Sequence, residues 1–375
     1  MDLRLDDERQ MLRDSLREFL AAECPRKRLD AIDADARGHS PELWQAMANL
    51  GWTGLCAPPQ YGGSGLGLRE LCIVIEEFGR ASLASPYFGT MLSQLAIARF
   101  GGDSQREILL PQIAAGRCLV ALARCDPEAP WETLRSGIVA EPCAGGYVLR
   151  GSIHFAAYAH VADRLLTLAH IGERGCERLA LFILDARSPG VRSELLELVG
   201  SERQCRLHFD GCRATTADAL GAIGDAGPIV RALDDWTLVA RCAEMVGGAQ
   251  RVLELATGYA SQRLAFGKPI GSFQAIQHHC ANMAVGVLGA RLITDEAIWL
   301  IERGEPNASD QAAVAKAWVG ETYRKICSLG HQVHGAIGFT WEHDLQRYFR
   351  HAFAADLAHG DALHHLDGIA SRLGL

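Results

Sequence analysis

The sequence lacks the motifs by which many metal and redox centres are recognised. Its twelve cysteines are scattered without a CxxC pair, and no HExxH motif occurs. Both patterns are typical of zinc sites, so we expect no metal centre. Cys72, Cys242 and Cys280 fall inside apolar helical patterns, where a free thiol behaves as a small hydrophobe. Scattered, unpaired cysteines favour a reducing, cytoplasmic compartment.

Positive charge is also scarce. The formal net charge is -8 and no long basic run is present, which argues against a general nucleic-acid-binding protein. The first residues mix Asp and Arg into their apolar positions, so we expect neither a signal peptide nor a membrane span. A length of 375 residues exceeds the usual size of a single domain and predicts two or three packed units.

Helical periodicity dominates both ends of the chain. Apolar positions recur at helical spacing in residues 1–115, and the same period returns over long stretches in residues 227–375. Long helices with short connections in the second region predict an antiparallel four-helix bundle. The helices that we expect span residues 5–22, 41–50, 68–79, 104–115, 229–266, 273–303 and 310–334, with a shorter one at the C-terminus.

The middle of the chain has a different pattern. In residues 116–226, short apolar or alternating runs lie between Gly and Pro residues, and their β-branched and aromatic content is typical of strands. Five or more such runs without long helices predict a small antiparallel, barrel-like β domain. The expected fold class is therefore mainly α with a central β domain: an N-terminal helical domain (1–115), the β domain (116–226) and a C-terminal helical bundle (227–375).

One glycine-rich segment resembles a nucleotide-binding loop. Residues 58–67 read PPQYGGSGLG, but their glycines follow a Pro-rich turn and not an apolar strand. The dinucleotide fingerprint requires that strand, so we favour a turn leading into the helix that begins near residue 68.

The most informative stretch is residues 259–277, YASQRLAFGKPIGSFQAIQ. The pattern predicts that a long helix stops at the FGKP tetrapeptide, with Gly267 in the left-handed position, and that Ser272 caps the next helix. This corner carries two cations, Arg263 and Lys268, and an exposed Phe266. The spacing leaves two interpretations open: a solvated turn, or an anion site in which the Arg263 fork binds phosphate oxygens.

Several motifs together resemble the acyl-CoA dehydrogenase family over essentially the whole chain. The specific ones are RxxFGxPI from Arg263 followed by Phe273-Gln274, and QVHGAIGF from Gln332; weaker ones are PxYGGSG from Pro59 and EExGR from Glu76. The resemblance implies FAD, α,β-dehydrogenation of an acyl-CoA substrate, and a homo-oligomer (dimer or tetramer) or a heterotetramer with a paralogous subunit. It also suggests an electron-transfer flavoprotein as acceptor.

The resemblance also implies site residues. In that family, the residues that match Arg263, Phe266 and Gln274 reach the FAD of a neighbouring subunit, where the Arg pairs with the pyrophosphate. The segment that matches Gln332, Gly335 and Ala336 wraps the adenosine end of a cofactor across another subunit boundary, and glycine lets the backbone approach it closely. Gly335 and Gly338 can instead be simple helix stops.

The chain departs from the family at the catalytic base. The usual Glu is replaced by His359, and the alternative Glu position, on the helix before the Arg motif, is occupied by Thr237. His359 is open to three interpretations: a base, a polar residue in a site that no longer catalyses, or a surface residue; we favour the non-catalytic ones. Asp234 and Asp235 are candidate substitutes, although surface acids on a helix are the commoner explanation.

The β domain departs as well. The family's Thr-Glu-Pro stretch, which touches the flavin, appears here as Arg124-Cys125-Asp126-Pro127, and its Trp-x-Thr appears as Phe155-Ala156-Ala157. Phe155 can still stack on a flavin, but Ala157 lacks the hydroxyl donor. Contacts to the chain's own flavin are thus eroded while those offered to a neighbour are intact. This pattern resembles the small, partner subunits of heteromeric enzymes such as pimeloyl-CoA dehydrogenase, whose tail is similar to GDxxHHL from Gly360.

Overall fold

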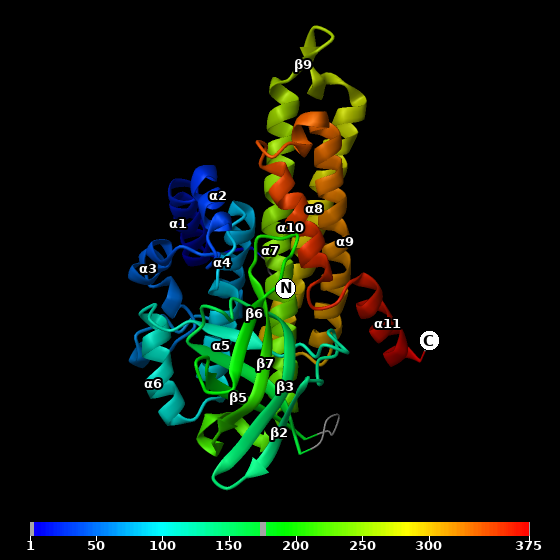
Figure 1. The fold of residues 1–375 in the computed structure, drawn as a ribbon. Helices are drawn as coiled ribbons and strands as arrows, with labels where there is room; N and C mark the ends of the chain where they lie inside the picture. The colour runs from blue at the N-terminus through cyan, green and yellow to red at the C-terminus, as the bar shows by residue number, and fades with distance from the viewer. Residues whose placement is uncertain (1–3, 173–177, 375) are drawn as a thin grey trace.

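The computed structural model describes residues 4–172 and 178–374. Six helices form the N-terminal part on one side of the molecule (Figure 1). The glycine-rich segment that follows α3 (Pro41–Asn49) contains a 3-10 turn, Pro59–Tyr61, and leads into α4 (Leu68–Ala81), as expected. These helices are α1 (Asp7–Glu23), α2 (Arg26–Ala34), α3 (Pro41–Asn49), α4 (Leu68–Ala81), α5 (Tyr87–Phe100) and α6 (Asp103–Ala114).

An eight-stranded sheet follows in the chain, in the order β6-β7-β3-β2-β4-β5-β8, with β1 paired to β4. Its strands are β1 (Val120–Ala123), β2 (Ile138–Cys143), β3 (Gly146–Ala157), β4 (Arg164–Ile171), β5 (Leu179–Asp185), β6 (Val191–Leu195), β7 (Gln204–Ala214) and β8 (Ala219–Gly224). Five pairings are antiparallel, but β1 and β2 both pair in parallel with β4. Over the described residues the sheet stays open and forms no closed barrel, so the expected antiparallel, barrel-like arrangement is wrong in these two respects: the sheet is mixed and it does not close.

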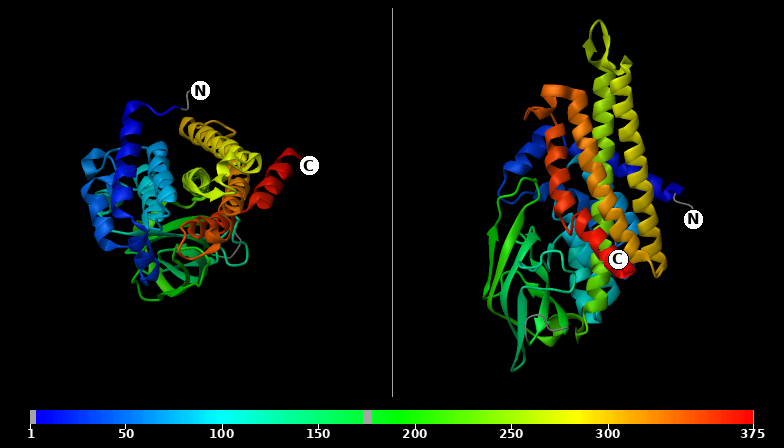
Figure 2. Two further views of the ribbon diagram at one scale, coloured as in Figure 1. Left: turned by 90° about the horizontal axis from the view of Figure 1, so that it is seen from above. Right: turned by 90° about the vertical axis from the view of Figure 1, so that its right-hand side faces the viewer.

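The C-terminal part is a bundle of long helices, which Figure 2 shows from two further directions. It contains α7 (Gly227–Gln262), α8 (Gln274–Arg303), α9 (Ala308–His334), α10 (Leu345–Leu357) and α11 (Ala362–Leu373). The predicted fold class is confirmed: helical parts at both ends with a β domain between them. The domain boundaries at residues 115 and 226 stay predictions.

Two glycines allow α4 and α7 to cross closely. A Cβ atom on Gly79 would lie 2.0 Å from the carbonyl oxygen of Glu244, and one on Gly247 would lie 1.8 Å from that of Glu76. Any side chain there would push the helices apart, so the sequence fixes a backbone-to-backbone contact between the N-terminal helices and the bundle. One hydrophobic core, which includes Leu71 and Val239, spans both parts, while the sheet encloses a second core around Leu149 and Phe182.

Helix α7 takes part in both of these packing contacts. Among the described residues, none of the helices is long and apolar enough to cross a membrane. The eleven cysteines in the described part of the chain are all free.

Candidate functional site

The corner after α7 is a projecting β-hairpin. Helix α7 ends at Gln262, and β9 (Leu264–Ala265) pairs with β10 (Lys268–Pro269) at the far tip of the bundle (Figure 1). Phe266 and Gly267 form the turn with φ angles of 53° and 79°. The left-handed Gly267 was predicted correctly, but the helix stops four residues before Phe266, because the chain reverses through two paired strands and not through a helix cap.

Ser272 also departs from its prediction. It does not cap α8, because Phe273 occupies the N-cap position and the Ser272 hydroxyl donates to the carbonyl oxygen of Pro269. A 3-10 turn, Ile270–Ser272, intervenes between the hairpin and the helix, and it uses the hydroxyl locally.

Polar side chains in and beside the hairpin are exposed. Arg263 and Gln274 are exposed, and Phe266 is 95% exposed. Over residues 4–172 and 178–374, the side chains of Arg263 and Gln274 make no hydrogen bond or ion pair, whereas Lys268 lies 4.5 Å from the centre of the Phe273 ring. A free guanidinium beside a bare aromatic suits an anionic ligand with a ring system, supplied from outside the chain.

The second predicted cofactor segment lies at the same end of the bundle. His334, the last residue of α9, stacks on Tyr259 of α7 with ring centres 4.6 Å apart. The chain then turns through a 3-10 helix, Gly335–Phe339, in which Gly335 adopts φ 66° and ψ -145°, a conformation essentially reserved for glycine. Gln332, Gly335 and Ala336 are exposed, so the backbone here is open to close approach by a ligand.

Phe155 is separate from that end of the molecule. It is on β3 in the sheet, is 48% exposed, and has a left-handed φ of 55°. Its ring meets only the edge of His154 among the ring contacts of the described residues. A strained, exposed aromatic on a strand remains a candidate stacking surface.

His359 lies in a turn that is held tightly within the chain. Its φ is 61° and that of Gly360 is 95°. The ammonium group of the buried Lys316 donates to the carbonyl oxygens of Asp356 and Gly360, each at 2.7 Å, and a ring nitrogen of His365 lies 3.0 Å from the carbonyl oxygen of His359. The turn at His359, where the resemblance predicts the base position, is thus fixed by side chains from α9 and α11.

The surroundings of His359 are positive. Its ring is parallel to that of Phe88 at 6.4 Å, and the guanidinium carbon of Arg241 lies 4.3 Å from the centre of the Phe88 ring. Burial, followed by the charges of Arg241, Arg124 and Lys316, lowers the pKa of His359 well below its ordinary value. The imidazole therefore stays neutral near pH 7 and resists taking up a proton, which is the opposite of what a general base requires.

The other candidate bases are already engaged. Thr237 is buried and its hydroxyl donates to the carbonyl oxygen of Leu233. Asp234 accepts hydrogen bonds from Thr133 at 2.8 Å and from Arg124 at 3.4 Å, so it bridges the β domain to α7.

Asp235, the residue after Asp234, is the remaining candidate base on α7. Burial raises the pKa of Asp235 to about 6, although it accepts a hydrogen bond of 2.7 Å from Ser309. A pKa near 6 suits proton transfer, but the only hydrogen-bond partner of Asp235 among the described residues is a hydroxyl on α9.

A buried ionic network next to His359 was missed in the sequence. Arg241 pairs with Glu244 and, at 3.4 Å, with Glu202; Glu244 also lies 3.3 Å from His351. Burial opposes the charge of Glu244, but Arg241 and His351 overcome it and lower its pKa to about 2. A signal was available, since Arg241 and Glu244 are three residues apart in an otherwise apolar part of the helix pattern.

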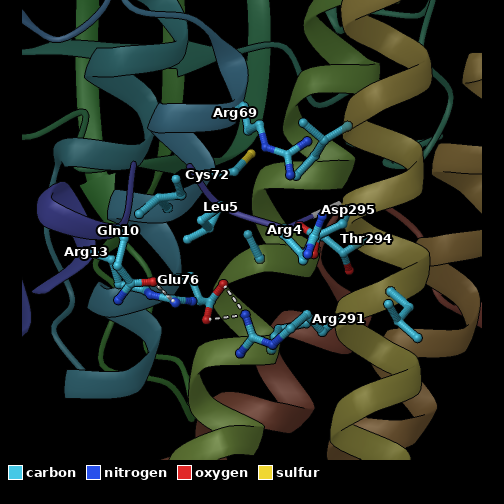
Figure 3. A pocket seen from close by; sticks show the side chains of 15 residues that line it. Arg4, Leu5, Gln10, Arg13, Arg69, Cys72, Glu76, Arg291, Thr294 and Asp295 are labelled. Carbon is cyan, nitrogen blue, oxygen red and sulfur yellow. Dashed lines mark hydrogen bonds and ion pairs between the residues drawn. The ribbon is translucent and has the colours of Figure 1, made fainter. Parts of the chain in front are cut away.

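A cavity of about 460 Å³ lies on another face of α7 (Figure 3). It is lined by residues of the start of the chain, α4, α7 and α8. Within this lining, the guanidinium of Arg291 pairs with the carboxylate of Glu76 at 2.8 Å. Burial, with the nearby Glu76, raises the pKa of Asp295 to about 6. Ala243, which lines the cavity, lies about 200° around the helix from Arg241, so this cavity faces away from the His359 turn. None of the predicted site residues lines it.

The described residues contain no cluster of three His, Cys, Asp or Glu side chains placed to hold a metal ion. They do fit a dinucleotide at the hairpin end, because Arg263 offers an unpaired cation and Gly335 offers bare backbone at one end of the bundle.

Known proteins resemble this chain along its whole length. Residues 6–117 match the acyl-CoA dehydrogenase N-terminal domain, and residues 235–374 match the acyl-CoA dehydrogenase C-terminal domain. Glutaryl-CoA dehydrogenase of Desulfococcus multivorans is 30% identical over 374 residues, which cover 96% of this chain and 95% of that protein. Acryloyl-CoA reductase (NADH) of Anaerotignum propionicum is 29% identical over 370 residues, with coverage of 96% and 93%.

Solved structures agree with these matches. A chain of the ChsE4-ChsE5 complex from Mycobacterium tuberculosis superposes with a TM-score of 0.90 at 27% identity, covering 100% of this chain and 99% of that chain. Glutaryl-coenzyme A dehydrogenase in complex with glutaryl-CoA gives a TM-score of 0.91 at 28% identity, with coverage of 100% and 97%.

Proposed function

This chain belongs to the acyl-CoA dehydrogenase family, whose cofactor is FAD, and from that premise we propose that it is one subunit of a heteromeric acyl-CoA dehydrogenase. In this assembly it lends Arg263 and its neighbours to an FAD held by a paralogous subunit. The paralogue supplies the carboxylate base that removes the α-proton of the acyl-CoA thioester.

One observation carries the proposal: the exposed guanidinium of Arg263, which has no partner among the described residues, at the base of a hairpin that projects from the bundle. An exposed Arg without an internal partner does little for the stability of its own chain. Placed on a projecting turn next to Phe266, it is instead positioned to reach a ligand bound on another subunit.

Each residue at this end has a defined part in the proposal. Arg263 forms charge-assisted hydrogen bonds to the pyrophosphate, and Phe266 and Gln274 contact the cofactor from the same corner. Gly335 and Ala336 give the adenosine end room against the backbone, with Gln332 as a polar contact. The bound FAD supplies the acceptor for the β-hydride; this chain orients it and takes no proton.

The absence of an acid at His359 supports the division of labour. Because Arg241, Arg124 and Lys316 face this position, protonating His359 would place a fourth positive charge among three others. We infer that the chain does not remove the α-proton by itself, and that Phe155 has at most a residual stacking role.

The ChsE4-ChsE5 structure supports a heteromer, because that neighbour is itself a complex of two different chains. An electron-transfer flavoprotein is the acceptor that we propose, and the free cysteines favour the cytoplasm as the compartment. A homo-oligomer is the competing assembly.

The test is co-expression with a paralogue that carries the Glu base. Arg263→Ala in this chain should lower FAD occupancy of the complex by about tenfold or more at limiting FAD, because charge-assisted hydrogen bonds are lost. Lys268→Ala is the matched control, since it removes the other cation of the same hairpin. If the complex keeps its FAD with Arg263→Ala, this chain does not contribute to the flavin site.

A second candidate function is favoured by the Arg124–Asp234 ion pair, which occupies the stretch that touches the flavin in the family. In this version the chain is a catalytically silent scaffold, or binds acyl-CoA without dehydrogenation. Anaerobic addition of acyl-CoAs to the complex separates the versions: binding without bleaching of the flavin would favour the second.

A further inference from the structure

The cavity between the start of the chain, α1, α4, α7 and α8 has no role in the proposed function. Its volume of about 460 Å³ is within the range of small-molecule sites. Charged side chains share its lining with apolar ones (Figure 3). Cations outnumber anions by four to two among these charged residues, which are Arg4, Arg13, Arg69, Glu76, Arg291 and Asp295.

One ion pair within the lining is complete. A terminal nitrogen of Arg291 on α8 lies 2.8 and 2.9 Å from the two carboxylate oxygens of Glu76 on α4. Both side chains are largely buried, with 26% and 15% exposed. This pair joins α8 to α4, and its two charges compensate each other without a ligand.

Asp295, one turn along α8 from Arg291, has no such partner. Over residues 4–172 and 178–374, its carboxylate accepts no hydrogen bond and forms no ion pair, although Arg69, Arg291 and Arg13 lie near enough for their charges to act on it. Burial, together with the charge of Glu76, raises the pKa of Asp295 to about 6. The ionised carboxylate therefore lacks the bonds that normally compensate for burial.

Arg13 on α1 is a group of opposite charge in a similar situation. Its side chain donates to the amide oxygen of Gln10 at 2.5 Å, but within the described part of the chain it pairs with no carboxylate, and its buried Nε has no hydrogen-bond partner. Figure 3 shows Arg13 and Asp295 at opposite sides of the cavity. A single molecule that carries an anionic and a cationic group supplies the missing partner of each.

The apolar part of the lining restricts what else such a molecule contains. Ile73 of α4, Val246 of α7 and Ile298 of α8 are buried and line the cavity. Its described lining includes no aromatic side chain on which a nucleobase could stack. An aliphatic chain suits these surfaces, because its burial removes apolar area from water.

We propose that this cavity binds an aliphatic amino acid, whose carboxylate is held by Arg13 and whose ammonium group is held by Asp295. Two kinds of amino acid share this chemistry: an α-amino acid, whose charges are adjacent, and an ω-amino acid, whose charges are separated by the aliphatic chain. Binding at this cavity does not depend on FAD at Arg263.

Isothermal titration of the full chain tests the proposal, with L-leucine as the α-amino acid and 5-aminopentanoate as the ω-amino acid. Each is compared with two probes that keep only one of its charges: 4-methylpentanoate and 3-methylbutylamine for leucine, pentanoate and butylamine for 5-aminopentanoate. At least one amino acid should bind, and its single-charge probes should bind at least about tenfold more weakly, because each leaves one charged group of the cavity without a partner. The amino acid that binds more tightly identifies the spacing of the charges.

Two variants separate the two contacts. Arg13→Met and Asp295→Asn should each weaken binding of the amino acid by at least about tenfold. Asp295→Asn should not weaken binding of the carboxylate probe, and Arg13→Met should not weaken binding of the amine probe. Arg303→Met is the control, because Arg303 is on α8, is 59% exposed and does not line the cavity. Asp295→Asn removes a buried charge without a partner, so it keeps the test valid even if Arg13→Met fails to fold.

The affinity should also depend on pH. Because the ammonium group pairs with the ionised form of Asp295, whose pKa is about 6, binding should weaken about tenfold between pH 7 and pH 5. The same fall should be absent in Asp295→Asn. The other charged groups that face Asp295 are Glu76, already paired with Arg291, and guanidiniums that keep their charge over this range; α7 contributes only Ala243 and Val246 to the lining.

The proposal is overturned if neither amino acid binds, if a single-charge probe binds as tightly as its amino acid, or if Asp295→Asn leaves the affinity for the amino acid unchanged. None of these titrations measures flavin, so failure here and failure of the proposed function are distinguishable.

Discussion

Two regions of the bundle, the turn at His359 and the hairpin, differ in how their charged side chains are bonded. Around His359, the ammonium group of Lys316 and the guanidinium of Arg241 are buried and bonded within the chain. At the hairpin, Arg263 is exposed and its side chain has no partner among the described residues. Charges bonded internally contribute to the fold, and charges left free on a projecting turn are available to another molecule. We therefore propose that the turn at His359, where the resemblance places the family's base, has a structural role, and that the hairpin is the part available to a cofactor.

Lys316→Met should give the largest effect, because it removes the internal bonds that hold the turn at His359. Removing the ammonium leaves the buried carbonyl oxygens of Asp356 and Gly360 unpaired, which should cost about 2–4 kcal/mol of unfolding free energy. Urea unfolding measures it, with Lys325→Met on the exposed side of α9 as control. Equal stability of the two variants would contradict the structural role given to this turn.

Gly335→Ala tests the backbone conformation at the hairpin end of the bundle. With φ 66° and ψ -145°, an alanine there should cost about 1–3 kcal/mol of unfolding free energy. Gly227→Ala, in the first turn of α7 with open space around its Cα, should be nearly neutral. If Gly335→Ala is also neutral, the open backbone needs no glycine and the cofactor contact assigned to it loses its physical basis.

Asp295→Asn shows what a buried charge costs without a matched partner. Because the pKa of Asp295 is raised to about 6 from its ordinary 3.8, the folded chain binds more protons than the unfolded one between these values, and stability falls as the pH rises through that window. The Asn variant should therefore be more stable by about 1–2 kcal/mol at pH 7. At pH 4 the gain should nearly vanish.

Unfolding measurements at the two pH values check this, with the exposed Asp367→Asn as control. A gain of equal size at both pH values would mean that the ionised carboxylate is not the cause.

Arg263→Ala should give the smallest change in the stability of the isolated chain, within about 0.5 kcal/mol, because an exposed side chain without a partner contributes little. Thermal unfolding of the chain alone measures it. A loss of more than about 1 kcal/mol would show that Arg263 is bonded within its own chain. It would also remove the contrast between the hairpin and the turn at His359.

The fold could be predicted well from the sequence where periodicity decides the structure. The helix predicted over residues 273–303 is observed as Gln274–Arg303, because a long amphipathic stretch with a left-handed Gly304 at its end leaves little choice. The corner at Phe266 was predicted less well, since two-residue strands carry no periodic signal. The parallel pairing of β1 and β2 with β4 depends on contacts distant in the chain, which local patterns do not contain.

The candidate site, too, could be predicted from the sequence only in part. The resemblance marked Arg263 and the missing acid at His359, because both are read from residue identity at a known position. The network of Arg241, Glu244 and Glu202 could not be predicted in full, because Glu202 approaches α7 only once the β domain has docked. The cavity next to Arg291 depends on how the start of the chain, α4, α7 and α8 pack together, which is a property of helix packing and not of any motif.

The visible spectrum of the purified full chain, recorded alone and together with a paralogue that carries the base, tests the central claim most directly. Under anaerobic conditions with a panel of acyl-CoAs, the chain alone should show no flavin that the substrates bleach, and the complex should be yellow and bleached. A chain that is yellow by itself and bleached by an acyl-CoA would contradict the account, because it would then hold its own flavin and remove the α-proton without a partner.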